Sequence, residues 1–278
     1  MKKRIAAVSM CRNDLFFSDR WISYYGKRLG FKNLYLFIDG IDQKLPLRAE
    51  KINCFQINHI KLNRLKADRF RAKRISEFAK ELHKKYDVVL ATDIDEFLVL
   101  DPNTGIELKE YLNKNFVSSS LSALGIDVAQ HPTFEKSIDK NKPFLSQRKY
   151  AIVSDRYTKP IISLEPLNWG SGFHRVKGKD FNIDPNLFLF HFGLVDIKTL
   201  ENKYKNNELI SLRWHNHLKR RYKLYKKIKN QIPVEADQLF EKAREYFKKN
   251  RKFIAWNKPS SLKIQNLIKI PERFKDLV

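Results

Sequence analysis

The sequence predicts an α/β fold built on a parallel sheet, and two observations support this prediction. Over the first hundred residues, short apolar runs alternate with amphipathic stretches, which is the pattern of βα units that feed a parallel sheet. Hydrophobic residues make up 42% of the 278 residues, and aromatic residues 13%. This composition is that of a globular protein, because disordered chains are depleted in such residues.

The N-terminal part is expected to contain two amphipathic helices between short buried strands. The first helix has Ser18 or Asp19 as its N-cap and ends at Leu29 before Gly30, and the second is a basic helix over 68–86. The strands around them are expected at 5–10, 34–38, 53–57 and 88–91.

The C-terminal part is less regular. Residues 1–198 are expected to form the main α/β domain, and residues 199–278 a basic helical region that packs on it or extends it. Within the first of these, the expected elements are a helix at 106–112, a strand at 121–128, a polar loop at 131–149 and short extended pieces over 150–192.

The charge of the chain is strongly positive. Lys and Arg number 55 against 31 Asp and Glu, a net charge of +24, which attracts polyanions and anionic membrane surfaces. Nucleic acid, phospholipid headgroups and phosphorylated small molecules are all candidate partners. A lysine-rich genome that places Lys on every solvated face would produce the same charge.

Cysteine usage and hydropathy indicate a cytoplasmic protein that at most lies on a membrane. Cys11 and Cys54 match no short metal-ligand or redox motif. No stretch approaches the roughly 18 continuous apolar residues of a membrane span. We therefore expect a cytoplasmic location, peripheral to the inner face of the cytoplasmic membrane.

A basic segment with interleaved aromatic residues at 213–229 is the expected membrane contact. Such helices suit an anionic membrane surface, and a simply solvated helix is the alternative. Nucleic acid would also suit them, but no recognised nucleic-acid module accompanies the charge. The segment contains Arg213, Trp214, Lys219, Arg220, Arg221, Tyr222, Lys223, Tyr225, Lys226, Lys227 and Lys229.

The sharpest chemical signal is the acidic run at Asp93, Asp95 and Glu96, directly after a predicted strand. Open α/β sheets bind ligands beyond the carboxyl ends of their strands. Two carboxylates at i and i+2 can share a Mg²⁺ or Mn²⁺ ion, which can then bridge a diphosphate. An acidic turn that caps the next helix is the structural alternative.

A phosphatase of the haloacid dehalogenase type is a second alternative, because its strand also ends in DxD. The match is poor, since Phe97 occupies the position expected for Thr or Val and 92 residues precede Asp93. A third alternative is a basic nucleic-acid-binding protein without enzymatic activity.

Three segments together resemble the GT-A glycosyltransferases. They are SMCRNDLFFSDRWISYYGKRLGFKNLYLFIDGID near the N-terminus, VVLATDIDEFLV in the centre and FLFHF later. The bacterial "family 2-like" and family-92-type group, with its D-x-D-E-F motif, is the most similar. The resemblance covers roughly residues 4–195. It implies a Rossmann-like fold with a mainly parallel central sheet and flanking helices.

The resemblance also implies an activity. It is the metal-dependent, hexosyltransferase-type transfer of a sugar from a nucleotide-sugar donor, with UDP-sugars favoured. The acceptor would be a glycan or glycolipid in bacterial envelope polysaccharide or lipopolysaccharide synthesis.

Site residues follow from the same resemblance. The nucleotide-sugar would contact the side chains or backbone of Arg12, Asn13, Asp39, Arg71 (with Arg74 as the next choice), Asp93, Gly170 and Gly172. Mn²⁺ or Mg²⁺ would be held by Asp93, Asp95 and His191, with His174 as the competitor of His191. Asp127 and Glu165 are candidate general bases for an inverting reaction, and a retaining reaction would not require such a base.

Overall fold

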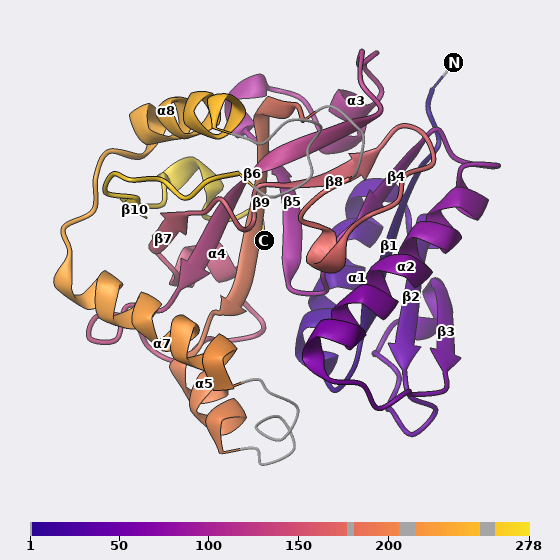
Figure 1. Cartoon of the computed structure of the whole chain (residues 1–278), viewed down its shortest axis with the longest axis horizontal. Helices are drawn as coiled ribbons and strands as arrows, with labels where there is room; N and C mark the ends of the chain where they lie inside the picture. The colour runs from indigo at the N-terminus through magenta and orange to yellow at the C-terminus, as the bar shows by residue number, and fades with distance from the viewer. Residues whose placement is uncertain (1, 177–180, 206–214, 251–258) are drawn as a thin grey trace.

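The computed structural model describes residues 2–176, 181–205, 215–250 and 259–278 (Figure 1). A ten-stranded sheet runs through the molecule in the order β10-β7-β6-β8-β4-β1-β2-β3, and β5 and β9 join it through β6. Helices flank the sheet, so the α/β class is confirmed.

The first four strands of the chain pair in parallel. They are β1 (Ile5–Cys11), β2 (Leu34–Asp39), β3 (Asn53–Ile57) and β4 (Val88–Ala91), in the spatial order β4-β1-β2-β3. All four predicted strands are confirmed. Because the strands are parallel, their carboxyl ends meet at one edge of the sheet.

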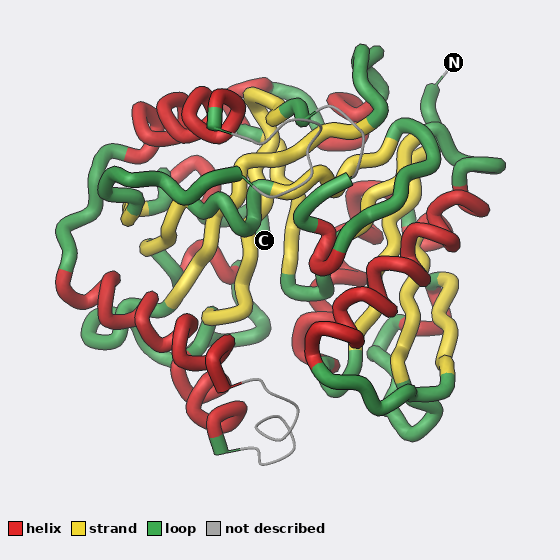
Figure 2. Tube along the Cα trace, in the orientation of Figure 1, coloured by secondary structure: helices red, strands yellow, loops and turns green. Residues whose placement is uncertain are grey.

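Helices α1 (Leu15–Leu29) and α2 (Arg64–Leu82) cover opposite faces of these strands (Figure 2). Alternate residues of a strand point to opposite faces. Accordingly, Ala7 packs in the same cluster as Trp21 of α1, whereas Val8 packs in the same cluster as Ile75 of α2.

Both helices begin earlier than the sequence predicts. Asp14 caps α1 by accepting from the Phe17 backbone N at 3.1 Å, and Asn63 caps α2 by accepting from the Lys66 backbone N at 3.1 Å. A capping side chain satisfies one of the free N–H groups of the first turn. The expected N-cap at Ser18 or Asp19 is therefore wrong by about one turn.

The second half of the sheet is largely antiparallel. Its elements are β5 (Glu96–Leu100), β6 (Ser120–Ala129), β7 (Tyr150–Val153), β8 (Lys159–Ser163), β9 (Ile183–Leu194) and β10 (Leu267–Lys269). Only β9 pairs in parallel, with β6. The expectation of a mainly parallel sheet therefore holds for β1 to β4 and is wrong for the rest. Parallel crossovers need a dozen or more connecting residues, more than the β4–β5 and β7–β8 connections provide.

Shorter elements complete the frame. The remaining α-helices are α3 (Leu108–Leu112), α4 (Phe144–Gln147), α5 (Ile197–Tyr204), α7 (His215–Asn230) and α8 (Ala236–Lys249). The 3-10 helices are η1 (Phe31–Asn33), η2 (Ala49–Lys51), η3 (Pro102–Thr104), η4 (Ser171–Phe173) and η6 (Glu272–Phe274).

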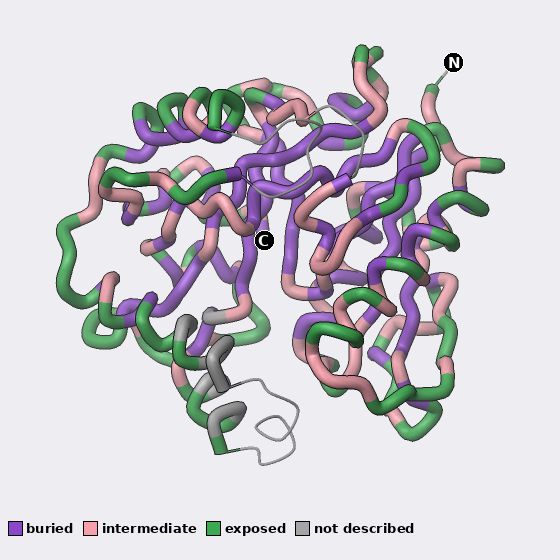
Figure 3. The backbone as a smooth tube through the Cα atoms, in the orientation of Figure 1, coloured by how far each residue is buried: buried purple, intermediate pink, exposed green. Residues whose placement is uncertain are grey.

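Residues after 199 share the core of the sheet (Figure 3). Helices are present as predicted, but β10 pairs with β7 and adds an unpredicted strand. Phe240 and Phe274 pack their rings against Phe188 of β9, with ring centroids 4.8 and 5.2 Å away. The C-terminal region therefore extends the sheet and seals one end of its core.

The predicted membrane contact at 213–229 is only partly consistent with this packing. Arg213 and Trp214 lie outside the described residues. Tyr225 is buried in a cluster with Ala129 and Leu267, so its ring is not available to a membrane. In the part of the chain that the structure describes, no helix combines the length and the apolar character needed to cross a membrane.

Candidate active site

The acidic run lies where the parallel half of the sheet meets the antiparallel half. Asp93 follows β4, and Glu96 begins β5 after a tight turn closed by the Glu96 N–H to Asp93 carbonyl bond, 3.1 Å. Strand β9 pairs His191 with Glu96 on one side and with Asp127 of β6 on the other. Three strands thus converge on one point, and two of the three predicted metal ligands, Asp95 and His191, meet there.

His191 is held between two carboxylates. Its Nε2 lies 3.2 Å from Oδ2 of Asp95, and its Nδ1 lies 2.7 Å from Oδ1 of Asp127. The ring stacks on Tyr157, with centroids 3.7 Å apart and planes 14° from parallel. Neither rotation nor a flip of the imidazole would preserve these contacts, so its orientation is fixed.

Asp93 is enclosed by two cations. Lys159 Nζ donates to Oδ2 of Asp93 at 2.9 Å, and Nη2 of Arg71 lies 3.1 Å from Oδ1. Burial alone would raise the pKa of the Asp93 carboxyl, but the charges of Arg71 and Lys159 outweigh it and lower the pKa. Asp93 is therefore ionised at neutral pH. Arg71, predicted from the sequence to contact the nucleotide-sugar, lies next to the acidic run.

Glu96 is fully buried beside the same lysine. Its Oε1 accepts from Lys159 Nζ at 2.5 Å, and its Oε2 accepts from the Asp93 backbone N at 3.1 Å. Burial raises the pKa of Glu96 to about 7. Burial alone would lower the pKa of Lys159, but Asp93 and Glu96 together raise it, so the ammonium stays charged.

The loop carrying η4 lies close to these groups. Burial, followed by the charge of Lys159, lowers the pKa of His174 far below its ordinary value, and its buried Nδ1 has no hydrogen-bond partner among the described residues. Gly172 has φ +63°, and a Cβ there would lie 2.9 Å from His174 Nε2. Gly172 is thus required by the turn itself, and Gly170 closes a backbone bond with the Arg175 carbonyl at 2.9 Å.

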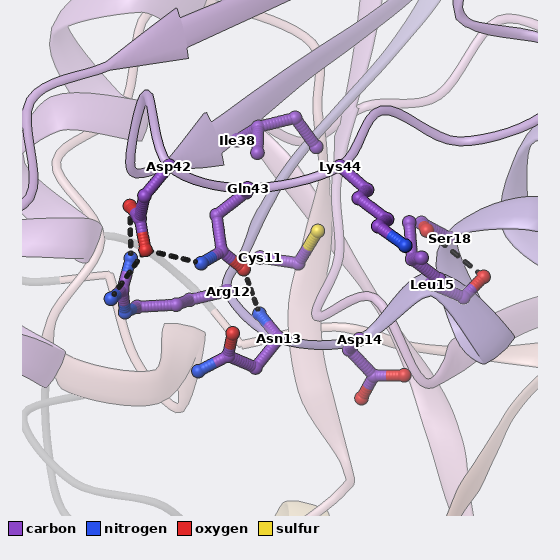
Figure 4. Close-up of a pocket in the computed structure, with 10 residues that line it drawn as sticks. All are labelled: Cys11, Arg12, Asn13, Asp14, Leu15, Ser18, Ile38, Asp42, Gln43 and Lys44. Atoms are coloured by element: carbon purple, nitrogen blue, oxygen red, sulfur yellow. Dashed lines mark hydrogen bonds and ion pairs between the residues drawn. The ribbon is translucent and has the colours of Figure 1, made fainter.

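A pocket of about 380 Å³ opens at the carboxyl ends of β1 and β2 (Figure 4). Arg12 and Asn13, two residues predicted to contact the nucleotide-sugar, line it together with Asp42 and Gln43. Arg12 Nη1 lies 3.2 Å from Oδ1 of Asp42, and the Asn13 backbone N donates to Oε1 of Gln43 at 2.9 Å. Burial raises the pKa of the Cys11 thiol in its wall to about 12, so that thiol is neutral.

Asp39 ends β2 at the same edge. Its Oδ2 lies 2.9 Å from Nδ1 of His59, while its buried Oδ1 has no hydrogen-bond partner in the part of the chain that the structure describes. Its backbone carbonyl accepts from Arg12 Nη1 at 2.6 Å. An unsatisfied buried acceptor is costly.

Two predicted residues do not reach the site. Strand β8 runs antiparallel to β4 and pairs Ser163 with Val89, so Glu165 lies beyond the opposite edge of the sheet from Asp93. It cannot act as a base there, and that prediction is wrong. Arg74 stands over the Phe70 ring, 5.4 Å from its centroid, rather than beside Asp93.

Lys159 and Tyr157 are the site residues that sequence reasoning missed. Lys159 lies 66 residues from Asp93 in the chain, and in a sequence with so many lysines nothing marks it out. Its one distinguishing feature in the sequence is that it directly precedes the apolar run of β8. A solvated lysine can occupy the same kind of position, so this feature does not identify a site residue.

The side chains of Asp95, His191 and Asp127 partly fit a divalent cation site. Within the described ranges, no three His, Cys, Asp or Glu side chains are already grouped as a metal site. Asp95 and His191, however, have facing ligand atoms 3.2 Å apart, and two adjacent ligands of an octahedral ion at about 2.1 Å lie about 3.0 Å apart. Asp127 supplies the carboxylate that typically orients a metal-binding histidine.

Comparison with known proteins found no matching family model and no matching curated sequence. The side chains and their geometry are therefore the basis on which a function can be assigned.

Proposed function

We propose that the chain is a metal-dependent glycosyltransferase. It would move a sugar from a nucleotide-sugar donor, with UDP-sugars favoured, to a glycan or glycolipid acceptor of the bacterial envelope. The observation that carries the proposal is the Asp95–His191–Asp127 arrangement at the same sheet edge as the pocket at Arg12 and Asn13. A cation-binding group beside a nucleotide-sized pocket is what a sugar-nucleotide requires.

The metal would take Asp95 and His191 as its protein ligands, and Mn²⁺ or Mg²⁺ suits this pair. Mg²⁺ in particular is usually held by one or two carboxylates and completed by waters and substrate phosphates. Asp93 can contribute only if it leaves Lys159 or Arg71, with which it is already paired. When bound, the cation would neutralise charge on the departing nucleoside diphosphate.

The cationic side chains would complete the electrostatic setting for the diphosphate. Arg71 is shared between Asp93, at 3.1 Å, and Asp68, at 3.5 Å, so its charge is fixed in place next to the acidic run. Preorganised charge of this kind requires no rearrangement during a reaction. Lys159 holds the turn that presents Asp95.

The nucleoside would occupy the pocket at β1 and β2. Asp39 lies next to this pocket, and its Oδ1, which is buried without a hydrogen-bond partner among the described residues, could accept from a ribose hydroxyl if the side chain turned toward the pocket. The backbone and amide groups around Asn13 and Gln43 can meet a base. Asp127 is engaged with His191, so in this proposal it is a positioning residue and not the general base.

The test is hydrolysis and transfer of UDP-, GDP- and CMP-sugars with Mn²⁺, Mg²⁺ or a chelator. Asp95→Asn removes a ligand charge and should lower metal-dependent turnover at least about 100-fold, the scale of losing one such electrostatic group. Glu77→Gln, in an exposed pair with Lys73, is the matched control and should retain activity.

Three results would count against the proposal. If Asp95→Asn keeps its metal-dependent turnover, the assignment of Asp95 as a metal ligand is wrong. Phosphate release from sugar phosphates without any use of sugar-nucleotides would favour the phosphatase. Nucleic-acid affinity unchanged by Asp95→Asn, with no sugar-nucleotide turnover in the parent chain, would favour the binding protein.

A further inference from the structure

Exposed apolar side chains gather on the loops that follow β2 and β3 and on the first turn of α2. Leu47 is 81% exposed, Ile41 71%, Leu65 65%, Ile60 51% and Leu45 50%. Single exposed apolar residues are common on protein surfaces, but these five lie within 25 consecutive positions at one sheet edge.

Hydrogen bonds tie these loops into one surface. Gly40 N donates to the Ile57 carbonyl at 2.8 Å, and Gln56 Nε2 donates to the Gln43 carbonyl at 2.9 Å. The hydrogen bond between His59 and Asp39 joins the end of β3 to the end of β2. We call this surface, residues 41–47 and 60–66, the apolar rim; Figure 3 shows exposed residues in this part of the chain.

The apolar rim borders the pocket of the candidate active site. Asp42, Gln43 and Lys44 line that pocket, and they stand between Ile41 and Leu45 in the chain. The same loop is anchored to α1, because the Leu47 backbone N donates to Oδ1 of Asp19 at 2.7 Å. The apolar side chains are therefore held outward on an ordered frame.

The charge around the apolar rim is positive. Lys44, Lys61 and Lys66 are exposed, and Arg69 continues the series on α2. The acids nearby are largely compensated, since Asp42 pairs with Arg12 and Asp68 pairs with Arg64 and Arg71. Apolar side chains flanked by lysines match the two layers of an anionic bilayer surface, its acyl boundary and its headgroups.

We propose that the apolar rim docks on an anionic lipid bilayer. A surface of separate loop tips suits a bilayer, which accepts scattered apolar side chains without needing one complementary shape. The basic helix α7 is a weaker candidate, because Leu224, Tyr225 and Ile228 are buried against the protein. If the proposed glycosyl transfer is also correct, docking would bring a lipid-anchored acceptor to the pocket mouth; the docking itself does not depend on that activity.

The experiment is flotation of the full chain with phosphatidylcholine vesicles and with vesicles that also contain phosphatidylglycerol. We expect binding to the anionic vesicles. Leu45→Ser combined with Leu47→Ser should weaken binding about 100-fold, because burying each leucine in the apolar layer contributes about tenfold. Lys61→Gln and Lys66→Gln should each weaken it about fivefold.

Val117→Ser combined with Ile232→Ser is the matched control, since these side chains are 103% and 86% exposed outside the rim. It should bind vesicles like the parent chain. Circular dichroism and thermal melting check that every variant folds, and none of the rim leucines lines the pocket, so UDP-sugar hydrolysis without vesicles should not change.

Parent-level vesicle binding by the folded leucine double variant would overturn the proposal. So would loss of binding when Lys219, Lys223 and Lys226 of α7 are changed to Gln while the leucine variant still binds, because α7 would then be the contact. Binding to nucleic acid but not to anionic vesicles would also overturn it. Vesicle binding without glycosyl transfer would leave the docking intact and count only against the proposed function.

Discussion

Lys159 Nζ donates to Oε1 of Glu96 at 2.5 Å, and both side chains are almost completely buried. The same ammonium donates to Asp93 at 2.9 Å. One lysine thus joins the residue before the β4–β5 turn to the residue after it. Because Asp95 lies inside that turn, the position of its carboxylate beside His191 depends on a side chain from a distant strand.

Replacing this lysine should destabilise the fold strongly. Lys159→Met leaves Glu96 buried without its cation, and breaking a buried pair in this way costs about 3–5 kcal/mol of the free energy of unfolding. Urea unfolding measures this loss in the free energy of unfolding. Lys73→Met, in an exposed pair with Glu77, should change stability by no more than about 0.5 kcal/mol.

The double variant Lys159→Met with Glu96→Gln separates charge from packing. It should recover part of the lost stability, because no buried carboxylate is then left at Glu96. If Lys159→Met is no more destabilising than Lys73→Met, the lysine does not hold the turn.

Stability should fall as pH rises through the titration of Glu96. Its pKa is about 7 in the folded protein, raised by burial, against about 4.3 in an unfolded chain. Between these values the folded state binds the extra proton, so the free energy of unfolding decreases with rising pH, by up to about 1.4 kcal/mol per pH unit. The loss is complete above about pH 7.

The variant Glu96→Gln tests whether the free energy of unfolding decreases with rising pH because of Glu96. Urea unfolding between about pH 5 and pH 8 should show a smaller decrease for Glu96→Gln than for the parent chain. Asp93 does not interfere, because its pKa is lowered and its contribution is lost only as pH falls below about 4. A parent chain whose advantage over Glu96→Gln grows with pH would contradict the prediction.

Asp127 should tune metal affinity through His191. Asp127→Asn keeps the shape of the side chain but removes the charge that faces Nδ1 at 2.7 Å. Loss of such an orienting carboxylate typically lowers metal affinity 10- to 100-fold. Calorimetric titration with Mn²⁺ measures the metal affinity independently of turnover. The control variant Glu77→Gln should bind Mn²⁺ like the parent chain. Unchanged affinity in Asp127→Asn would remove Asp127 from the metal site.

Gly125 should be intolerant of any side chain. A Cβ at this β6 position would lie 2.2 Å from the carbonyl carbon of Tyr157 and 2.4 Å from the backbone N of Thr158. Gly125→Ala must therefore push apart the backbone that carries Tyr157 and Lys159, at a cost of about 1–3 kcal/mol or more. It should also lower Mn²⁺ affinity.

Gly105→Ala is the comparison for this variant. That glycine has φ +68°, and a Cβ there would meet no atom of the described residues within 4 Å, so alanine carries only backbone strain, about 1–2 kcal/mol. Mn²⁺ affinity should be unaffected. Equal effects of the two variants on Mn²⁺ affinity would mean that the close approach at Gly125 does not position the site.

Several elements could be predicted closely from the sequence. The strands 53–57 and 88–91 match β3 and β4 residue for residue, because short apolar runs between turns leave little choice of boundary. The convergence of Arg12, Asp39 and Asp93 on one edge also followed from local order, since parallel strands bring their carboxyl ends together.

The sequence by itself determined the parallel βα half, its edge and the acidic run placed on it, since each depends on neighbours in the chain. Tertiary structure decided the rest. Antiparallel pairing of β8 carried Lys159 to Asp93 and Glu165 away from it, and the pairing of β5, β6 and β9 joined Asp127 to His191. Strand direction and register are set by packing between distant segments, so no local pattern could reveal them.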